Sequence, residues 1–598
     1  MASTFGYTLQ AWQQRYQQDP QQLRTLLTAH LDALNAQDNA WIYLATPAQL
    51  EAQIAPLLDR YQQDPTALPL FGVPFAVKDN IDVAGWPTSA ACPAFTYTAQ
   101  ADATVVARLK AAGAVVVGKT NLDQYATGLV GTRSPFGAVS NTFNPDYVSG
   151  GSSSGSASVL ARGLVAFSLG TDTAGSGRVP AGFNNIIGLK PTKGWLSARG
   201  VVPACRLNDT VSVFALTVED AFTVANLAAG YDKEDAYSRI SPRTAPASLN
   251  ARPRFAIPAA AEFFGDRQAE DAWLAALAQL EAEGATLHPI DFTPFHQLAE
   301  QLYYGPWVAE RTVAVGEMIH RPQEMDPVVH GIVSSGLKYS AVEAFQAEYL
   351  RAEYTRQIAE ALAPFDALVV PTSPTIHTLD EMKQEPVRYN SQFGTYTNFT
   401  NLADLSALAL PGPFRADGLP AGITLIAPAW HDRALAAFGL RWQHRLALPL
   451  GATGEALPAQ PAVLPPSTAH VRVAVVGAHL TGMPLNHQLT SRDAVLVTET
   501  HTADSYRLFA LLDGPIKKPG LLRSDRGAAI TVELWDIPLA RFGEFVAEIP
   551  APLGIGSLTL ADGSSVKGFI CEPAALTQAL EITEFGGWRN WLAAQGSN

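Results

Sequence analysis

The chain has 598 residues, of which 47% are hydrophobic and 16% are charged, and its formal net charge is -14. This length exceeds what one ordinary hydrophobic core supports, so we expect a globular protein of two or more domains. The acidic balance excludes a nucleic-acid partner, which needs a basic face, but it leaves the class of small substrate open.

The cysteines and the lack of long apolar runs indicate a protein that is not exported. Cys92, Cys205 and Cys571 are too few for a disulfide framework, and their spacing fits no metal site. We therefore expect reduced thiols, a cytoplasmic location and no bound metal. Residues 1–7 carry no signal-like pattern, and no apolar run is long enough to span a bilayer, so we expect no membrane partner.

The predicted elements change character along the chain. Residues 8–65 alternate apolar and polar side chains at helical spacing, which predicts two or three amphipathic helices. From about 70 to 218, short β-branched runs alternate with Gly-rich turns and helical stretches, which predicts α/β layers around a largely buried sheet. Farther on, 265–284 and 335–363 predict long helices, and 366–371 (DALVVP) predicts a buried strand that stops at proline.

Two Gly/Ser-rich loops follow Lys78 within the α/β region. They are 150–155 (GGSSSG) and 172–178 (DTAGSGR), and the second loop comes after 164–170, an apolar stretch that predicts a strand. A Gly-rich turn after a strand lets backbone N–H groups point at one spot, where they can hold an oxyanion. Ser176 lies at the end of this turn. The expected oxyanion donors are the N–H groups of Thr173, Ala174 and Gly175.

A serine hydroxyl is a poor nucleophile until a base removes its proton, and the sequence has no histidine between His30 and His288. Lys78 follows the apolar run 71–77, and burial lowers a lysine pKa by several units from about 10.4. Ser152 is the natural proton relay between this lysine and the nucleophile. Taken singly, these features are more often a turn, a phosphate loop or a surface lysine. Their combination favours serine catalysis with lysine as the base.

Three segments resemble the amidase signature family: 150–157 (GGSSSGSA), 170–180 (GTDTAGSGRVP) and 188–192 (GLKPT). The resemblance implies an α/β fold in which helices flank a mixed central sheet, and a Ser-cisSer-Lys triad. The chain departs from the commoner family pattern at Ala174, which is usually Gly, and at Gly177, which is usually a bulky aliphatic residue. Neither departure removes a reacting group.

The same resemblance implies a role for each residue of the site. By position, Ser176 is the nucleophile, Ser152 is the relay serine and Lys78 is the base. Asp172 and Arg178 are expected to fix the conformation of the loop between them.

A finer resemblance connects 121–133 (NLDQYATGLVGTR), 174–180 and 303–311 (YYGPWVAER) to the allophanate hydrolase branch of the family. Allophanate is urea that carries a carboxylate on one nitrogen. The resemblance implies that Tyr303 and Arg311 bind the substrate, and a planar guanidinium matches a carboxylate well.

Spacing alone favours a plainer interpretation of Arg311. Pro306 is expected to open a helix, which places Arg311 in its second turn. An arginine there is usually exposed to solvent or paired with an acid such as Glu310. The family resemblance reverses this expectation.

Composition also predicts where the chain divides. Pro, Ala and Gly dominate 451–468, which is typical of an interdomain linker. We therefore expect an amidase domain over 1–450, with N-terminal helices in 1–65, and a C-terminal domain over 469–598. The family resemblance covers roughly 25–445.

The C-terminal domain carries a distinctive segment, 477–489 (GAHLTGMPLNHQL), followed by strand and turn signals at 553–560 and 566–572. These resemble the extra domain of allophanate hydrolases, a smaller α+β module like the γ-glutamylcyclotransferase-type barrel. The resemblance links this domain to decarboxylation of the first product. His479 and His487 are candidate proton carriers, although two histidines near a turn are as often structural or surface groups.

Together these patterns predict hydrolysis of allophanate to ammonia and carbon dioxide through an acyl-enzyme on Ser176. The C-terminal domain is expected to assist decarboxylation of N-carboxycarbamate, in urea or triazine nitrogen use. The alternatives are an amidase of other small linear amides, biuret-like or malonamate-like, and a noncatalytic amidotransferase-type subunit. The mechanism needs a small-molecule substrate but no metal or other cofactor, and the family suggests a homodimer.

Overall fold

The structure, a computed structural model, describes residues 7–16, 19–458, 467, 469–512, 516–577 and 579–595. The described residues form two compact units. The N-terminal unit holds the described parts of 1–240 and 254–460, and the C-terminal unit holds those of 241–253 and 461–598. Within the described ranges, the helices are all too short or too polar to cross a membrane.

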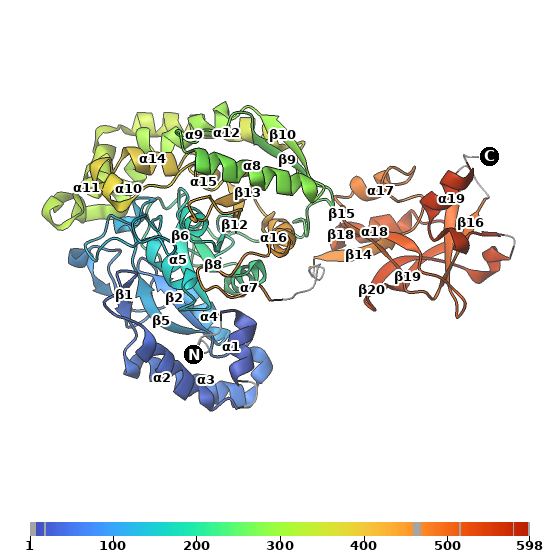
Figure 1. The fold of residues 1–598 in the computed structure, drawn as a ribbon, viewed down its shortest axis with the longest axis horizontal. Coiled ribbons are helices and arrows are strands. Elements are labelled where there is room, and N and C mark those ends of the chain that lie inside the picture. Colours follow the sequence, from blue (N-terminus) through green and yellow to red (C-terminus); the bar gives the residue numbers. More distant parts are fainter. Residues whose placement is uncertain are drawn as a thin grey trace. The chain divides into compact units, whose positions relative to one another are not determined.

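The N-terminal unit is built on a mixed sheet that has eleven strands among the described residues (Figure 1). Its β5, β2 and β6 strands are parallel and completely buried, as expected of strands that are covered on both faces. Other neighbours, such as β6 and β8, run antiparallel, so the predicted α/β fold with a mixed sheet is confirmed. In sheet order the strands are β1 (Trp41–Leu44), β5 (Val115–Thr120), β2 (Pro74–Lys78), β6 (Phe167–Asp172), β8 (Thr210–Ala215), β7 (Ile187–Lys190), β12 (Leu405–Pro411), β13 (Gly422–Pro428), β11 (Ala367–Pro371), β9 (Arg254–Pro258) and β10 (Thr286–Ile290).

The predicted N-terminal helices are α1 (Leu9–Tyr16), α2 (Gln22–Ala33) and α3 (Pro47–Gln63). Helix α3 begins with a capping box, in which Thr46 and Gln49 satisfy each other's backbone N–H groups. The short strand β1 lies between α2 and α3 and was not predicted, because its four residues are too few to show a period.

The two long helices predicted farther along are also present, as α8 (Arg267–Ala282) and α12 (Ala341–Leu362). Helix α12 starts later than predicted because 335–338 form a separate 3-10 turn, after which Ser340 and Glu343 cap the helix. The other helices of the unit are α4 (Thr104–Ala111), α5 (Ser154–Ala161), α6 (Val179–Phe183), α7 (Val218–Ala228), α9 (Thr293–Tyr304), α10 (Val308–Val315), α11 (Pro327–Ser334), α13 (Leu379–Gln384), α14 (Arg388–Phe393), α15 (Phe399–Leu402) and α16 (Asp432–Leu446).

The C-terminal unit is rich in strands, as predicted. Its described strands form a five-stranded sheet and a three-stranded sheet, and β17 and β20 bring the two sheets into contact. The five-stranded sheet is β15 (Val495–His501), β18 (Thr531–Pro538), β14 (His470–Val475), β20 (Ser565–Cys571) and β19 (Leu553–Thr559). The other is β17 (Lys518–Arg523), β16 (Tyr506–Leu511) and β21 (Leu580–Glu581), and the helices are α17 (His487–Thr490), α18 (Leu539–Ala547) and α19 (Trp588–Gln595).

The predicted linker begins as ordered chain. Ala452 donates its N–H to the carbonyl of Ala161 at 2.8 Å, and the Asn185 amide donates to the Gly451 carbonyl at 2.9 Å. Residues 459–466 and 468 of the linker lie outside the described residues. The division at 451–468 therefore stays a prediction.

Candidate active site

The sheet topology places Lys78, the candidate base, near the loop that carries Ser176, the candidate nucleophile. Strands β2 and β6 are parallel neighbours, so their carboxyl ends meet at one edge of the sheet. Lys78 is the last residue of β2, and Thr171 and Asp172 end β6. Ser152 lies at the same edge, two residues before α5, which packs against both strands.

Lys78 is fully buried and donates two hydrogen bonds to hydroxyl groups. Its Nζ lies 2.7 Å from Ser152 Oγ and 2.8 Å from Thr171 Oγ1. Burial, the largest influence, lowers the pKa of Lys78 to about 7, although nearby carboxylates oppose this shift. Those carboxylates are Asp123, Asp172 and Asp209. The amine is therefore poised to accept a proton near neutral pH.

Asp172 and Arg178 hold the turn that carries Ser176. The Asp172 carboxylate accepts from Arg178 Nε at 2.9 Å and from its Nη2 at 3.0 Å, and both side chains are fully buried. Burial alone would raise the pKa of Asp172, but the charge and hydrogen bonds of Arg178 outweigh it, so the pKa is lowered. Arg178 also donates to Thr400 Oγ1, which fastens the turn to α15. The supporting roles of the pair in catalysis stay a prediction.

The same carboxylate occupies one of the predicted oxyanion donors. The N–H groups of Gly175 and Gly177 donate to Asp172 at 3.0 and 2.9 Å. Within the described part of the chain, the N–H groups of Thr173 and Ala174 have no such acceptor. The geometry thus favours Thr173 and Ala174 over Gly175 as donors to a bound oxyanion.

Ser152 and Ser176 are both buried, with Ser176 3% exposed. The Gly151–Ser152 peptide is cis, as the resemblance implies. The described side chains show no hydrogen bond between Ser152 Oγ and Ser176 Oγ. The first contact of the predicted relay is therefore present, from Lys78 to Ser152, and the second stays a prediction.

Asp123 contacts the backbone of Ser152, the candidate relay serine. Its N–H donates to the Ser152 carbonyl at 3.1 Å, and its carboxylate accepts the N–H groups of Val130 and Gly131, each at 3.0 Å. A Cβ atom at Gly151 would overlap that carboxylate, so only glycine fits there. Sequence reasoning did not assign Asp123 a role.

The Gly177 departure from the family pattern also has a structural reason. A Cβ at Gly177 would lie 2.5 Å from the Cβ of Ser212, on the neighbouring strand β8. A bulky aliphatic side chain would therefore require this part of the sheet to move.

Arg311 is buried rather than exposed, with 1% of its surface accessible. Its Nη1 donates to Thr127 Oγ1 at 3.1 Å, and its Nη2 donates to the Tyr303 hydroxyl at 3.0 Å. The guanidinium carbon also lies 4.9 Å from the centre of the Tyr303 ring. Its Nε has no hydrogen-bond partner among the described residues. The interpretation of Arg311 as an exposed or acid-paired arginine is therefore wrong, because Glu310 binds elsewhere.

Glu310 instead joins α10, the helix of Arg311, to the loop that contacts the turn of Ser176. Its Oε2 accepts from Cys205 Sγ at 2.9 Å and from the Leu207 N–H at 3.0 Å. In the same loop, Asp209 accepts the N–H of Cys205 and the hydroxyl of Thr173. Burial, followed by the charge of Glu310, raises the pKa of Cys205 well above its ordinary value.

An open cavity of about 810 Å³ reaches Tyr303. Asn398 and Gly394 line the same cavity, close in sequence to Thr397, whose carbonyl accepts from Arg178 at 3.1 Å. Tyr303 therefore lines this cavity and also accepts a hydrogen bond from the buried guanidinium of Arg311.

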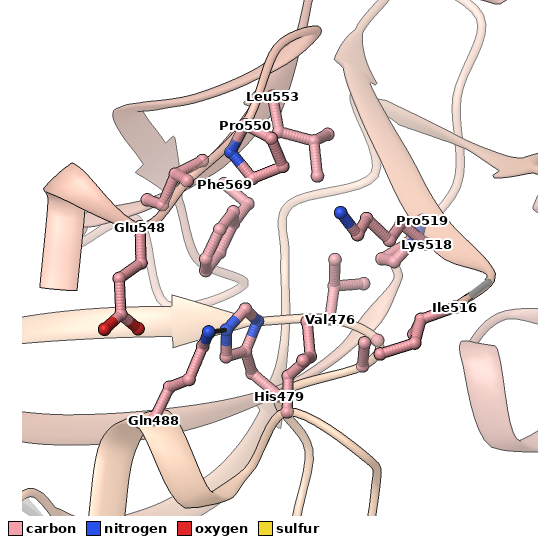
Figure 2. A pocket seen from close by; sticks show the side chains of 14 residues that line it. Val476, His479, Gln488, Ile516, Lys518, Pro519, Glu548, Pro550, Leu553 and Phe569 are labelled. Carbon is pink, nitrogen blue, oxygen red and sulfur yellow. Dashed lines mark hydrogen bonds between the residues drawn. The ribbon is translucent and has the colours of Figure 1, made fainter. Parts of the chain in front are cut away.

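The C-terminal unit has a cavity of its own, and His479 lines it (Figure 2). His479 Nε2 lies 2.7 Å from Gln488 Oε1, and its ring stacks on Phe569. Burial, the largest influence, lowers the pKa of His479. His487 is exposed, does not line the cavity, and its Nδ1 lies 3.0 Å from the Pro484 carbonyl. The structure therefore separates the two candidate histidines.

Known proteins match both units of this chain. The Amidase family matches residues 23–436, so the chain belongs to the amidase family. The allophanate hydrolase C-terminal domain matches residues 471–593.

Relatives match almost the whole chain. The structure of Kluyveromyces lactis allophanate hydrolase is 44% identical, with a TM-score of 0.84, covering 99% of this chain and 100% of that one. Urea amidolyases of Lachancea kluyveri and Saccharomyces cerevisiae are 45% and 44% identical over 93% and 98% of this chain. The chain spans about a third of the length of these curated relatives, 31% and 33%.

Proposed function

We propose that this chain hydrolyses allophanate at the Lys78–Ser152–Ser176 site. The observation that carries the mechanism is the 2.7 Å hydrogen bond from buried Lys78 to Ser152. The full-length similarity to an allophanate hydrolase supports the substrate. The buried guanidinium of Arg311 supplies the cation that the carboxylate of allophanate requires.

In the first half-reaction, neutral Lys78 takes the proton of Ser152 as Ser152 takes that of Ser176. Ser176 Oγ attacks the terminal amide carbonyl, and the N–H groups of Thr173 and Ala174 stabilise the oxyanion. The C–N bond breaks, and the proton returns through Ser152 to the leaving ammonia. The acyl group left on Ser176 carries the carboxylate of the substrate, which Arg311 and Tyr303 hold.

In the second half-reaction, water attacks the acyl-enzyme and gives up its proton along the same route. The product is N-carboxycarbamate, and Ser176 is restored. We propose that the C-terminal unit then assists its decarboxylation, with His479 as the proton carrier. The cavity around His479 favours this residue over exposed His487.

Ammonia release from allophanate by the purified chain tests the first step, with biuret and malonamate as competing substrates. We expect the highest kcat/KM for allophanate, and loss of ammonia release in Ser176→Ala. Wild-type rates in Ser176→Ala would overturn the assigned nucleophile. Higher kcat/KM for biuret or malonamate would favour the amidase of other linear amides.

We also propose a homodimer in the cytoplasm. Helix α12 exposes Val342, Phe345 and Tyr349 by 67%, 64% and 64%, at spacings that place them on one face, and such a stripe favours burial against a second copy. Buried free thiols at all three cysteines suit a reducing compartment. Light scattering should give twice the chain mass for the wild type and a lower mass for Phe345→Glu.

A further inference from the structure

The wall of the cavity that reaches Tyr303 includes the side-chain amide of Asn398. Three glutamates in the same wall are exposed to solvent, so water already binds their carboxylates. Gln392 and Asn398 are buried polar residues of this wall, and each is 8% exposed. Gln392 Oε1 has a partner, His377 Nε2 at 2.7 Å. Asn398 Oδ1 has no hydrogen-bond partner among the residues that the structure describes.

The amide oxygen of Asn398 is therefore suited to a ligand that brings a hydrogen-bond donor. Buried polar groups nearly always have a partner, because an acceptor that leaves water loses its hydrogen bonds unless the protein or a ligand replaces them. The side-chain torsion that rotates an asparagine amide is soft, so Oδ1 can turn toward a donor in the cavity. An N–H group of a substrate would supply this donor.

The fold leaves space for this amide at Gly394, which lines the same cavity. A Cβ atom at Gly394 would lie 2.4 Å from Asn398 Nδ2 and 2.5 Å from Oδ1. The backbone does not require glycine here, because φ is -83° and ψ is -3°, values that other residues adopt in turns. Contact with the Asn398 amide therefore explains the glycine better than backbone geometry does.

The residue before Asn398 contacts the turn that carries Ser176. Thr397 is fully buried, and its carbonyl accepts from Arg178 Nη2 at 3.1 Å. A Cβ atom at Gly175 would lie 2.4 Å from Thr397 Oγ1, so this hydroxyl packs against the turn itself. Residues 397 and 398 thus connect the turn to the wall of the cavity.

We infer that Asn398 is a specificity-determining residue, which accepts the inner N–H of allophanate through Oδ1. The inference rests on the proposed function and deepens it. In allophanate, this N–H lies between the carboxylate, assigned to Arg311 and Tyr303, and the carbonyl that Ser176 attacks. Asn398 is connected to both ends, because it lines the same cavity as Tyr303 and follows Thr397 at the turn of Ser176.

An acceptor at this point distinguishes allophanate from a close analogue. Malonamate has the same carboxylate and the same terminal amide, but CH₂ replaces the inner N–H. A site that binds an N–H rejects an analogue without it, because the buried acceptor then stays unpaired in the filled cavity. Biuret and malonamide, which carry no carboxylate, differ from each other by the same replacement.

The ratio of kcat/KM for allophanate to kcat/KM for malonamate measures this contact. Asn398→Leu should lower the ratio by about tenfold or more, because it removes the acceptor at similar volume. Differences in intrinsic reactivity cancel when the ratios of variant and wild type are compared, and the folded fraction cancels within each ratio. Gly394→Ala should also lower the ratio, because its Cβ displaces the amide without removing it.

Thr395→Val is the matched control. Thr395 lines the same cavity, but its hydroxyl already donates to the Gln392 carbonyl at 2.7 Å, so the ratio should not change. Asn398→Asp keeps an oxygen acceptor, so it should retain most of the ratio, while its charge lowers kcat/KM for both anionic substrates.

An unchanged ratio in Asn398→Leu would overturn the inference, as would an equal loss of the ratio in Thr395→Val. If Asn398→Leu does not fold, as judged by circular dichroism, the ratio in Gly394→Ala decides in its place.

Turnover by the wild type separates this inference from the proposed function. If the wild type releases no ammonia from allophanate, the proposed function fails. The ratio of kcat/KM for biuret to that for malonamide then tests the N–H contact: a loss of about tenfold in Asn398→Leu supports it, and an unchanged ratio overturns it. A wild type that releases ammonia from none of the four amides overturns both.

Discussion

The two candidate sites bury a nitrogen base in opposite ways. Lys78 is completely enclosed, donates to two hydroxyls and is surrounded by three carboxylates. His479 lines a cavity, and its partner is the neutral amide of Gln488. Burial is the largest cause that lowers the pKa in both cases.

The difference shows how surroundings suit a base to its task. Around Lys78, paired charges and buried loops keep the amine in one place, which suits a proton relay that must repeat the same path. Around His479, the hydrogen-bonding partner is an uncharged amide. One base is thus held by hydroxyl groups within a buried network of paired charges, and the other is held by a neutral amide in the wall of a cavity.

The sharpest test of the first site replaces its base. Lys78→Met should reduce ammonia release by roughly 10²–10⁴-fold, because general-base catalysis contributes about that much. Lys190→Met is a matched control: Lys190 is equally buried, burial lowers its pKa to about 7, and it donates to the Leu405 carbonyl rather than to a serine.

In the control, activity per folded molecule should be retained. Equal losses in Lys78→Met and Lys190→Met, after correction for the folded fraction measured by circular dichroism, would show that burial rather than the serine contact matters.

The paired charges of the first site should also dominate its stability. Arg178→Met should lower the free energy of unfolding by about 3–5 kcal/mol, because Asp172 would stay buried without its partner. Arg24→Met removes an exposed pair with Glu51, whose side chains are 48% and 47% accessible, and should cost less than about 1 kcal/mol.

At the other site, Gln488→Ala should cost about 1 kcal/mol, for one neutral hydrogen bond. Urea unfolding that follows each unit separately measures these differences. A loss of unfolding free energy in Arg178→Met as small as that in Arg24→Met would show that the buried charge network stabilises the fold no more than an exposed ion pair does.

Substrate recognition should depend on the shape of the cation as well as on its charge. Arg311→Lys should lower kcat/KM for allophanate by about 10- to 100-fold, because a lysine cannot form a planar, two-pronged contact. Tyr303→Phe should lower it less, by about tenfold, because one hydroxyl contact is lost. Steady-state kinetics with allophanate measure both, and an unchanged kcat/KM in Arg311→Lys would contradict the assigned carboxylate contact.

The smallest expected effect is a shift along the pH axis. Only neutral Lys78 accepts a proton, so kcat/KM should rise with pH through about 7 and then level off. Asp123→Asn removes a negative charge that raises the pKa of Lys78, so the rise should move to lower pH, by about one unit or less. Glu51→Gln is the control. Glu51 is exposed, so its charge has far less influence on Lys78, and the pH profile of this variant should match that of the wild type. A shift to higher pH in Asp123→Asn would reverse the assigned sign.

Local patterns were enough to predict much of the fold. The apolar run before Lys78 predicted its burial, and β-branched runs and helical periods placed β11, α8 and α12. The Gly-rich loops predicted the position of the turn that carries Ser176. These features depend on neighbours in sequence, which is why one sequence shows them.

Contacts between distant segments could not be predicted in this way. Thr171 and Asp123 touch the relay from other parts of the chain, and neither has a periodic or compositional signal. Both residues do lie within segments that carry the family resemblance, 170–180 and 121–133, which was their one available signal. The hydrogen bond from the Gly175 N–H to Asp172 could not be predicted either, because the sequence does not show which backbone donors a carboxylate binds. Likewise, helical position predicted an exposed Arg311, whereas tertiary packing buries it.

The enclosed thiol of Cys205 has a practical consequence for chemical inhibition. Thiolates, not thiols, react with alkylating reagents, and burial raises the pKa of both Cys205 and Cys571. Iodoacetamide or a maleimide should therefore leave the folded protein active, even though Cys205 is hydrogen-bonded to the residue beside Arg311. Under the proposed mechanism, inhibitors of this protein are better designed as carbamoylating electrophiles directed at the Ser176 hydroxyl than as thiol reagents.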